Sequence, residues 1–501
     1  MTTHLIRTIR LLVSTSVLAT SATGRDSGEN RMALSPADIQ ISQRCVTEHN
    51  VGDIALGLDN FGTIGPTYWT GTFDFFTGQP VRSCQYPIGS NQSYLWGGAI
   101  WVGGIIGTDT LVSVGVDGWN SGEELHADVE PLGAIRYRST LSGNSAYSNG
   151  AVSHQDFLAT YYDTCQYCTV DGALVRDWLD KRTHKPLNLR IDQRTYAWRY
   201  PWIDDAVIWD VSITNIGTTA ISKACIGLYV DGDVKIASED LGFLDDVTGF
   251  MGSTDIPGTA CATQKPLPLA WIADNDGDLT TWGRQLPHVT GVAVLSDPAI
   301  LGGPSYNWWT SSSAVRCDFG PMRRVNARDF GSGGTGTPLG DRNKYYILSN
   351  GDVDYDAVFG ATIGDNDPIW LPRQGDLLPC DEGGDVRYLL SVGPFDLAPG
   401  QSVPFTFAYV GGKDLHTDPS NLQNLPLDPW RYYSHLNFTN LTNNAVWASW
   451  VYDNPGVDTD SDGYAGQFSV CNSDTIWTAG DGVPDFRAAF PPPRPGFTVK
   501  P

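Results

Sequence analysis

Apolar and polar residues alternate along several segments of the chain, in the pattern that half-buried β-strands show. The clearest case is 206–233, where the turn sequence Asn215-Ile-Gly217 separates two such segments. The apolar positions are Val207, Trp209, Val211 and Ile213 before the turn, and Ile226, Leu228 and Val230 after it. This segment therefore predicts a hairpin of two antiparallel strands, each with one face toward a core.

The same strand–turn–strand pattern returns in 387–411, around the turn Leu397-Ala-Pro-Gly400. Glycines in 93–118 permit close approach of paired strands, or β-bulges. Further expected elements are short buried strands at Leu269–Ile272 and Val292–Leu295, and an exposed Gly-, Ser- and Arg-rich loop at 302–343. Repeated short strands with turns between them predict an all-β fold, a large antiparallel β-sandwich of the immunoglobulin-like or supersandwich type.

The C-terminal part has a different pattern. Asp428-Pro429 is a helix start, with Asp as N-cap and Pro at the first helical position. A second helix is expected over Asn443–Tyr452, where apolar side chains share one face, and Asn454-Pro-Gly456 ends it. We therefore expect a small helical and acidic-loop module after the sandwich.

The expected organisation has five parts. They are a signal peptide at 1–22, a polar leader at 23–44, a sandwich region at 45–412 that is one sandwich or two, the module at 413–489, and a proline-rich linker at 490–501.

The N-terminus has the features of a secretory signal. His4, Arg7 and Arg10 precede the short apolar run Leu11–Ala22, which ends in small residues. An organelle transit peptide is the alternative, because Ser and Thr dilute the apolar run. Export predicts a secreted, extracellular or cell-surface protein and makes disulfides possible among the 9 Cys. For the single close pair, Cys165 and Cys168, a structural disulfide or two buried thiols is favoured over a zinc site.

Composition and charge exclude some classes of partner. The chain has 501 residues, 41% hydrophobic and 18% charged, which suffices for large cores. Its formal net charge of −24 argues against nucleic acid, because phosphate backbones are repelled. No apolar run reaches the length that a membrane-spanning helix needs.

The most specific chemical signal is the acidic loop Asp458-Thr-Asp460-Ser-Asp462-Gly463-Tyr464. Carboxylates at alternate positions of a tight loop converge, and hard oxygen ligands at this spacing suit Ca²⁺. Glycine at the sixth position permits the sharp turn, and the Tyr464 carbonyl could add an oxygen. Ser469 replaces the bidentate Glu of an EF-hand, so Asp481 and Asp485 are expected to supply the missing ligands. The alternative is an exposed acidic turn without metal.

Three further acidic runs are weaker candidates. Asp274, Asp276 and Asp278 form a second predicted calcium site, with a solvated turn as the equal alternative. Asp231-Gly-Asp233 ends a strand and carries less metal signal. Asp352, Asp354 and Asp356 alternate and are expected to line the wet face of an edge strand.

Catalytic signatures are sparse. The sequence has no HExxH, GxSxG, P-loop or GxGxxG motif. Glu123, Glu124 and His126 form the best acid–base group, with an ordinary polar loop as the favoured interpretation. Trp119, Trp308 and Trp309 could be sugar platforms, but core packing is the default for tryptophan in a β protein.

Several phrases together resemble a family of large secreted bacterial β-sandwich proteins of unknown function, which often end in sorting or fibronectin-III-like domains. The phrases are Thr195–Trp198, Trp209–Gly217, Tyr229–Val234, Ala273–Asp278, Gly393–Gly400, Val451–Gly463 and Gly480–Phe486. The strand around Asn215 is also similar to adhesion-type immunoglobulin-like modules. The resemblance implies an exported β-sandwich and assigns no activity.

These observations predict a secreted, calcium-stabilised structural or adhesive protein of the cell surface or extracellular matrix, without enzymatic activity. Its expected partners are an extracellular glycan or a surface protein, and self-association is also compatible. The alternative is an extracellular polysaccharide hydrolase, with Glu123 and Glu124 as catalysts, or a lectin-like carbohydrate-binding protein.

Overall fold

The alternating segment before the Asn215 turn forms strand β14, Ala206–Asn215, in a computed structural model of the chain. Its four predicted core residues, Val207, Trp209, Val211 and Ile213, all lie in the main buried cluster. The structure describes residues 43–66, 72–118, 124–129, 132–167, 169–170, 173–257, 263–296, 301–311, 318–330, 336–372 and 383–487. The predicted signal peptide, nearly all of the leader and the C-terminal linker lie outside these residues.

The first antiparallel sheet follows the order β16-β5-β4-β2-β3-β6-β15-β21-β20, with β1 beside β2 and β7 beside β6. Its strands are β1 Val46–His49, β2 Ala55–Asp59, β3 Thr63–Ile64, β4 Cys84–Gln85, β5 Gln92–Ser93, β6 Gly97–Ile106, β7 Asp109–Val114, β15 Ile221–Asp231, β16 Lys235–Ile236, β20 Pro304–Thr310 and β21 Val386–Leu397.

The second antiparallel sheet follows the order β17-β18-β19-β22-β14-β13-β10-β8, with β9 beside β10. Besides β14, its strands are β8 His126–Ala127, β9 Arg136–Arg138, β10 Gln155–Asp163, β13 Leu189–Ala197, β17 Val247–Asp255, β18 Gln264–Ala273, β19 Val289–Val294 and β22 Ser402–Gly412. Two small hairpins stand apart from both sheets, β11 Thr169–Val170 with β12 Ala173–Leu174, and β23 Gln467–Cys471 with β24 Asp474–Ala479.

The two sheets share one core. Ile226, Leu228 and Val230 of β15 belong to the same buried cluster as Trp209 and Val211 of β14. Because these strands lie in different sheets, the shared cluster shows that the sheets pack face to face. The predicted all-β antiparallel sandwich is therefore confirmed.

The connections between the predicted strand pairs differ from the prediction. β14 pairs with β22 and β15 pairs with β21, so neither sequence-adjacent pair forms a hairpin. Instead, each turn carries the chain from one sheet to the other, in a β-arch. Apolar alternation shows which face of a strand is buried but not which strand lies beside it.

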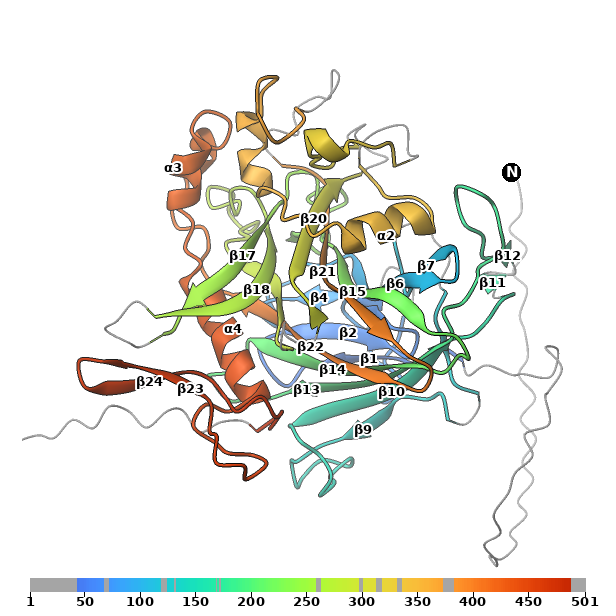
Figure 1. Cartoon of the computed structure of the whole chain (residues 1–501). Helices are drawn as coiled ribbons and strands as arrows, with labels where there is room; N and C mark the ends of the chain where they lie inside the picture. The colour runs from blue at the N-terminus through green and yellow to red at the C-terminus, as the bar shows by residue number, and fades with distance from the viewer. Residues whose placement is uncertain are drawn as a thin grey trace, which may run out of the picture. The chain divides into compact units, whose positions relative to one another are not determined.

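Helices cover the outer faces of both sheets (Figure 1). Helix α2, Asp341–Ser349, places Ile347 and Leu348 in a cluster with Trp101 of β6 and Tyr229 of β15. On the other sheet, α4, Thr439–Tyr452, belongs to a cluster that includes Ile208 of β14. Further helical elements in the described part of the chain are α3 Pro429–Ser434 and the 3₁₀ turns η2 Arg324–Asn326, η3 Ala357–Thr362 and η5 Asn421–Asn424.

Both predicted C-terminal helices are confirmed. Asp428 caps α3, and its side chain accepts a hydrogen bond from the Arg431 amide at 3.2 Å. Helix α4 begins four residues earlier than expected, at Thr439, and ends at Tyr452, just before Asn454. Among the described helices, none combines the length and the hydropathy that a membrane span requires.

The prediction of an exposed loop at 302–343 is wrong. This range holds the buried strand β20 and the start of α2. The segment looks polar because α2 buries Asp341, Asn343 and Lys344, and the ion-pair partners of Asp341 and Lys344 come from distant parts of the chain. Lys344, for example, pairs with Asp117.

The sandwich core gives a first prediction. Trp209 is 0% exposed and stacks on Phe407 with ring centroids 5.4 Å apart, whereas Trp282 is 96% exposed. We expect Trp209→Ala to lower the free energy of unfolding by about 3–5 kcal/mol, because it leaves a large cavity. The matched control Trp282→Ala should change it by less than about 0.5 kcal/mol. Denaturant unfolding measures both, and equal losses would contradict this core.

Candidate metal sites

Three groups of aspartates bring carboxylates together in the described part of the chain. They are Asp458, Asp460 and Asp462; Asp245, Asp246 and Asp274; and Asp231, Asp233 and Asp385. In each group, one oxygen per residue lies within 4.8 Å of the others. Two ligands of one Ca²⁺ ion stand at most about 5.2 Å apart, so each group could hold a metal ion.

The first group is the predicted acidic loop, and it is exposed. Asp458 accepts hydrogen bonds from the amides of Asp462 at 3.1 Å and Gly463 at 2.9 Å. The Asp462 amide also donates to Asp460 at 3.1 Å. Gly463 has φ +94°, which favours glycine over residues with a Cβ. Backbone amides thus turn the three carboxylates toward one another.

The second acid pair of this region is hydrogen-bonded to the loop through Thr459, and its role as metal ligands stays a prediction. Thr459 donates its amide to Asp481 and its hydroxyl to Asp485, the latter at 2.9 Å. Asp485 also accepts from the Asn454 amide at 2.9 Å. Tyr464 directs its amide to Asp462 at 2.8 Å, and its side chain is exposed. Asp481 and Asp485 are thus held beside the loop, while the group whose oxygens lie within 4.8 Å of one another contains Asp458, Asp460 and Asp462.

The second predicted trio, Asp274, Asp276 and Asp278, is not brought together as one group. Asp274 is buried and meets Asp245 and Asp246. Asp276 accepts from the Asp278 amide at 2.6 Å, and Asp278 faces Arg284 at 3.9 Å. Sequence reasoning missed the adjacent pair Asp245 and Asp246. The sequence feature that could have identified this pair is two adjacent acidic residues directly before an apolar strand.

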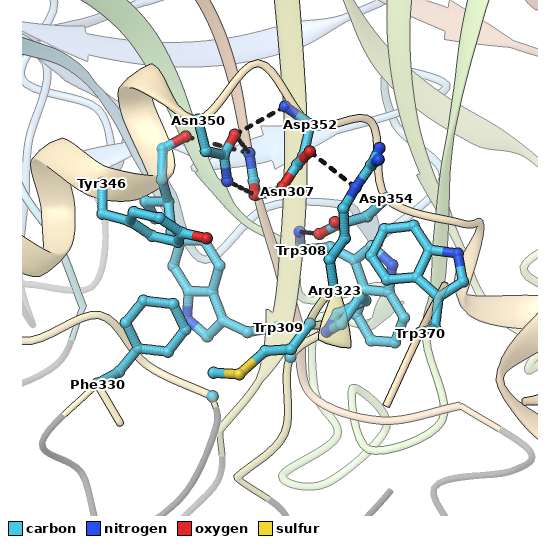
Figure 2. Close-up of a pocket in the computed structure, with 15 residues that line it drawn as sticks. Asn307, Trp308, Trp309, Arg323, Phe330, Tyr346, Asn350, Asp352, Asp354 and Trp370 are labelled. Carbon is cyan, nitrogen blue, oxygen red and sulfur yellow. Dashed lines mark hydrogen bonds and ion pairs between the residues drawn. The ribbon is translucent and has the colours of Figure 1, made fainter. Parts of the chain in front are cut away.

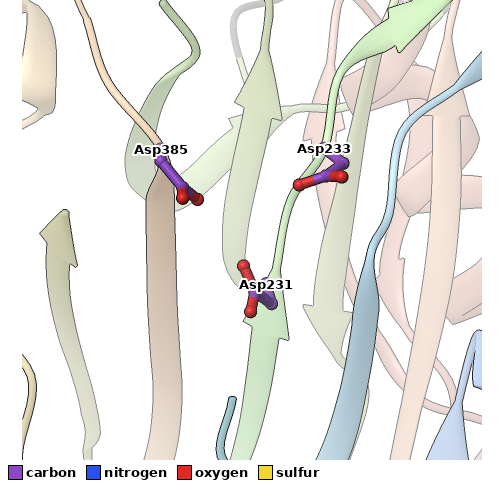
Figure 3. Close-up of side chains that lie close together, drawn as sticks. All are labelled: Asp231, Asp233 and Asp385. Carbon is purple, nitrogen blue, oxygen red and sulfur yellow. The ribbon is translucent and has the colours of Figure 1, made fainter. Parts of the chain in front are cut away.

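The third group forms where β15 ends and β21 begins, and Figure 3 shows the three carboxyl groups turned toward a common space. Arg387 lies between two of them, 3.1 Å from Asp231 and 2.8 Å from Asp385. Lys235 pairs with Asp233 at 2.9 Å. Burial raises the pKa of Asp231 to about 8, against the opposing effect of Arg387. Two cations thus offset most of the charge in this group.

The alternating acids at 352–356 do not line a strand, so that prediction is wrong. Asp354 is buried and accepts from the Trp308 amide at 3.1 Å. Asp356 accepts from the Phe250 amide at 2.9 Å. Burial raises the pKa of Asp356 to about 7. Both side chains satisfy backbone donors of neighbouring strands.

Glu124, the described member of the catalytic candidate pair, is buried. It accepts from the Val114 amide at 3.0 Å and lies 3.2 Å from His184. His184 also contacts the buried Asp163 at 2.8 Å. The His126 ring contacts the carbonyl of Ala127, with Nδ1 and the oxygen 2.9 Å apart. Glu123 and Trp119 lie outside the described residues.

Trp308 and Trp309 are both 2% exposed, so core packing is confirmed for them. Near them is a cavity of about 20 Å³ (Figure 2). Its lining includes Trp370 and the ion pair of Arg323 with Asp352 at 2.7 Å. A cavity of this size has room for about one water molecule, not for a sugar ring.

No family model matches the chain. A search of curated proteins also finds no match. Among solved structures, the chain is similar to a GH36 alpha-galactosidase from Geobacillus stearothermophilus, with TM-score 0.24, 10% identity, and coverage of 74% of this chain and 41% of that one.

Two other solved structures show similarity at the same level. A putative aldose 1-epimerase from Escherichia coli has TM-score 0.23 and 10% identity, over 74% of this chain and 100% of that one. A putative kojibiose phosphorylase from the human microbiome has TM-score 0.22 and 8% identity, over 82% of this chain and 38% of that one. TM-scores this low do not establish a common fold.

The buried His184 gives a prediction on pH. Burial by itself would lower its pKa, but the carboxylates of Glu124 and Asp163 raise it from 6.5 to about 11. The protonated ring therefore stabilises the fold fully below about pH 6.5, and this contribution falls as pH rises toward 11. We expect His184→Gln to lower the melting temperature at pH 6, with a smaller difference from wild type at pH 10.

The control is His435→Gln, since His435 is only half-buried and pairs with Asp418 at 3.1 Å. It should leave the melting temperature almost unchanged at both pH values. A difference for His184→Gln that grows with pH would contradict the charged pairing.

Proposed function

We propose that the protein is a secreted, calcium-stabilised structural or adhesive β protein of the cell surface or extracellular matrix, without enzymatic activity. The observation that carries this proposal is the acidic loop of Asp458, Asp460 and Asp462, with a second acidic segment bonded to it. In the absence of a cation, the three carboxylates of this loop, whose oxygens lie within 4.8 Å of one another, repel one another. A calcium ion cancels that repulsion and couples metal binding to local folding.

The loop supports an exposed hairpin, which is the proposed contact surface. β23 presents Phe468, 57% exposed, and Val470, 67% exposed. The Phe468 ring packs on Trp477 of β24 with centroids 5.2 Å apart. Gly456, two residues before the loop, lies under the Trp477 ring so closely that a Cβ there would approach it to 3.1 Å. Fixing the loop therefore fixes the hairpin.

Apolar and aromatic side chains on an exposed hairpin suit contact with sugar rings or with a partner protein. Figure 1 shows the hairpin extending beside α4, away from the sheets. Lys265 of β18 ties its base to the body through the Thr478 carbonyl at 2.7 Å. This arrangement favours a binding role, and it is equally compatible with the lectin-like alternative.

Disulfide bonding supports the extracellular location. Cys165 and Cys471 each take part in a disulfide bond, and Cys84 and Cys225 are buried thiols. Disulfides form and persist mainly in oxidising compartments outside the cytosol. Cys168, the sequence neighbour of Cys165, lies outside the described residues.

Calcium dependence is tested by metal removal. Dialysis against a chelator should lower the melting temperature, and Ca²⁺ at about 100 times its dissociation constant should restore roughly 2.7 kcal/mol. Asp460→Asn should reduce this gain, whereas Asp474→Asn, an exposed aspartate in the hairpin outside the loop, should keep it. Differential scanning calorimetry with and without CaCl₂ measures the effect. Equal calcium response in Asp460→Asn and wild type would refute a metal site in this loop.

The adhesive role is tested on immobilised polysaccharide. We expect the full chain to be retained on cellulose, chitin or amylose resin in CaCl₂, and Phe468→Ser to be retained less, because it removes the exposed ring. Leu427→Ser is the control, since Leu427 is 84% exposed and lies outside the hairpin. Equal retention of Phe468→Ser and wild type would contradict the hairpin as contact surface. Release of reducing sugar would instead establish the hydrolase alternative.

A further inference from the structure

Six aspartates gather at one end of the sandwich, where four strands begin or end. Asp231 ends β15 and Asp233 follows it, while Asp385 directly precedes β21. Asp245 and Asp246 directly precede β17, and Asp274 directly follows β18. The bridge between Asp246 and Gly384 connects the segments that lead into the two sheets. We call these six residues the acidic belt.

The basic partners of the belt are unevenly distributed. Arg387 and Lys235 pair with Asp231, Asp385 and Asp233. Among the described residues, no Lys, Arg or His forms an ion pair with Asp245, Asp246 or Asp274. Arg284 lies near Asp245 but forms its ion pairs with Glu239 and Asp278, and the His416 ring contacts the Asp274 carbonyl at 2.8 Å. This half of the belt therefore has no ion pair of its own among the described residues.

Asp246 gives the strongest indication of a ligand, because its side chain is 0% exposed and only one of its two carboxylate oxygens accepts a hydrogen bond. Its Oδ2 accepts a hydrogen bond from the Val234 amide at 2.9 Å. No described residue donates a hydrogen bond to its buried Oδ1. A buried carboxylate oxygen that accepts no hydrogen bond costs on the order of several kcal/mol in desolvation free energy. A bound cation, or protonation of the carboxylate, removes this cost.

The neighbouring carboxylates are positioned to share such a cation with Asp246. Asp274 is held by the amides of Asp276 at 2.9 Å and Gly277 at 2.6 Å. Its carboxylate, and that of Asp245, lie within 4.8 Å of the Asp246 carboxylate. A hollow of about 440 Å³, lined in part by Asp245 and Asp274, leaves space for water ligands and a path of entry.

We propose that a calcium ion binds between Asp245, Asp246 and Asp274, where β17 begins and β18 ends in the second sheet. Three carboxylates from two segments and water from the hollow provide the oxygen ligands that Ca²⁺ accepts. Asp276 and Asp278, the partners that the sequence suggests for Asp274, are not ligands of this ion. The site shares no residue with the loop of Asp458, so the two proposed sites can be tested independently.

The test uses the full chain carrying Asp460→Asn, so that the exposed loop is weakened beforehand. After chelation and dialysis, calorimetric titration with CaCl₂ should still show one bound ion, and the ion should raise the melting temperature. Adding Asp246→Asn or Asp245→Asn should weaken this binding by roughly tenfold or more, since each removes a charged ligand. Asp245 is exposed, so its variant keeps the test open if Asp246→Asn does not fold.

Two controls complete the design. Asp240→Asn changes an exposed carboxylate that lines the same hollow, and it should leave the binding unchanged. Asp276→Asn should also leave it nearly unchanged. The proposal is overturned if the Asp460→Asn chain binds no calcium, or if Asp245→Asn and Asp246→Asn bind it as tightly as their parent. It is also overturned if Asp276→Asn abolishes binding while Asp245→Asn does not.

Discussion

Two stacked arches determine how the sandwich is built. The turns after β14 and β21 each carry the chain between sheets, and the strands on either side pair with those of the other arch. Asn215 joins the two turns, since its side-chain amide donates to the carbonyls of Leu397 at 3.0 Å and Thr219 at 2.9 Å. The Gly400 amide returns a bond to the Asn215 carbonyl at 2.8 Å. One buried side chain thus fixes both crossings, and a fully satisfied buried amide tolerates few alternative arrangements.

The arches also explain why acids meet at the opposite end. The register of β15 with β21 sets Asp231 opposite Arg387, and the bridge from Asp246 to Gly384 brings the start of β17 beside them. Gly383 permits this approach, because its φ is +122° and a Cβ would lie 2.1 Å from the Asp245 carbonyl oxygen. Strand pairing therefore brings these carboxylates together at a place where few basic side chains lie beside them. Packing alone does not favour such a concentration of charge, so its neutralisation is part of the fold.

What the sequence could predict depended on how local each feature is. The inward faces of β14 and β15 follow from a period of two, and α4 follows from its helical spacing and the stop at Asn454. The loop of Asp458 is contiguous, so its convergence could be predicted from one short segment. The partners Asp481 and Asp485 lie close enough in sequence for proximity to be a fair hypothesis.

Features that depend on distant pairing could not be predicted in this way. The arches look like hairpins in sequence, because alternation records burial and not the neighbouring strand. Asp245 and Asp246 join Asp274 only through the pairing of β17 with β18, which matches Val247 to Ala273. Helix α2 was hidden because it buries polar residues, among them Asp341, which pairs with Arg182 far away in the chain.

The exposed loop and the acidic belt differ in what an ion bound there would control. The hydrogen bonds of the loop join residues between Asn454 and Asp485, so a cation there acts on the C-terminal segment and the β23–β24 hairpin. The belt joins the ends of strands from both sheets, so charge neutralisation there acts on the sandwich as a whole. Local opening of a protein follows such boundaries, because segments with few shared contacts unfold separately. A cation bound in the loop would therefore act on the hairpin while the sandwich that carries it stays folded.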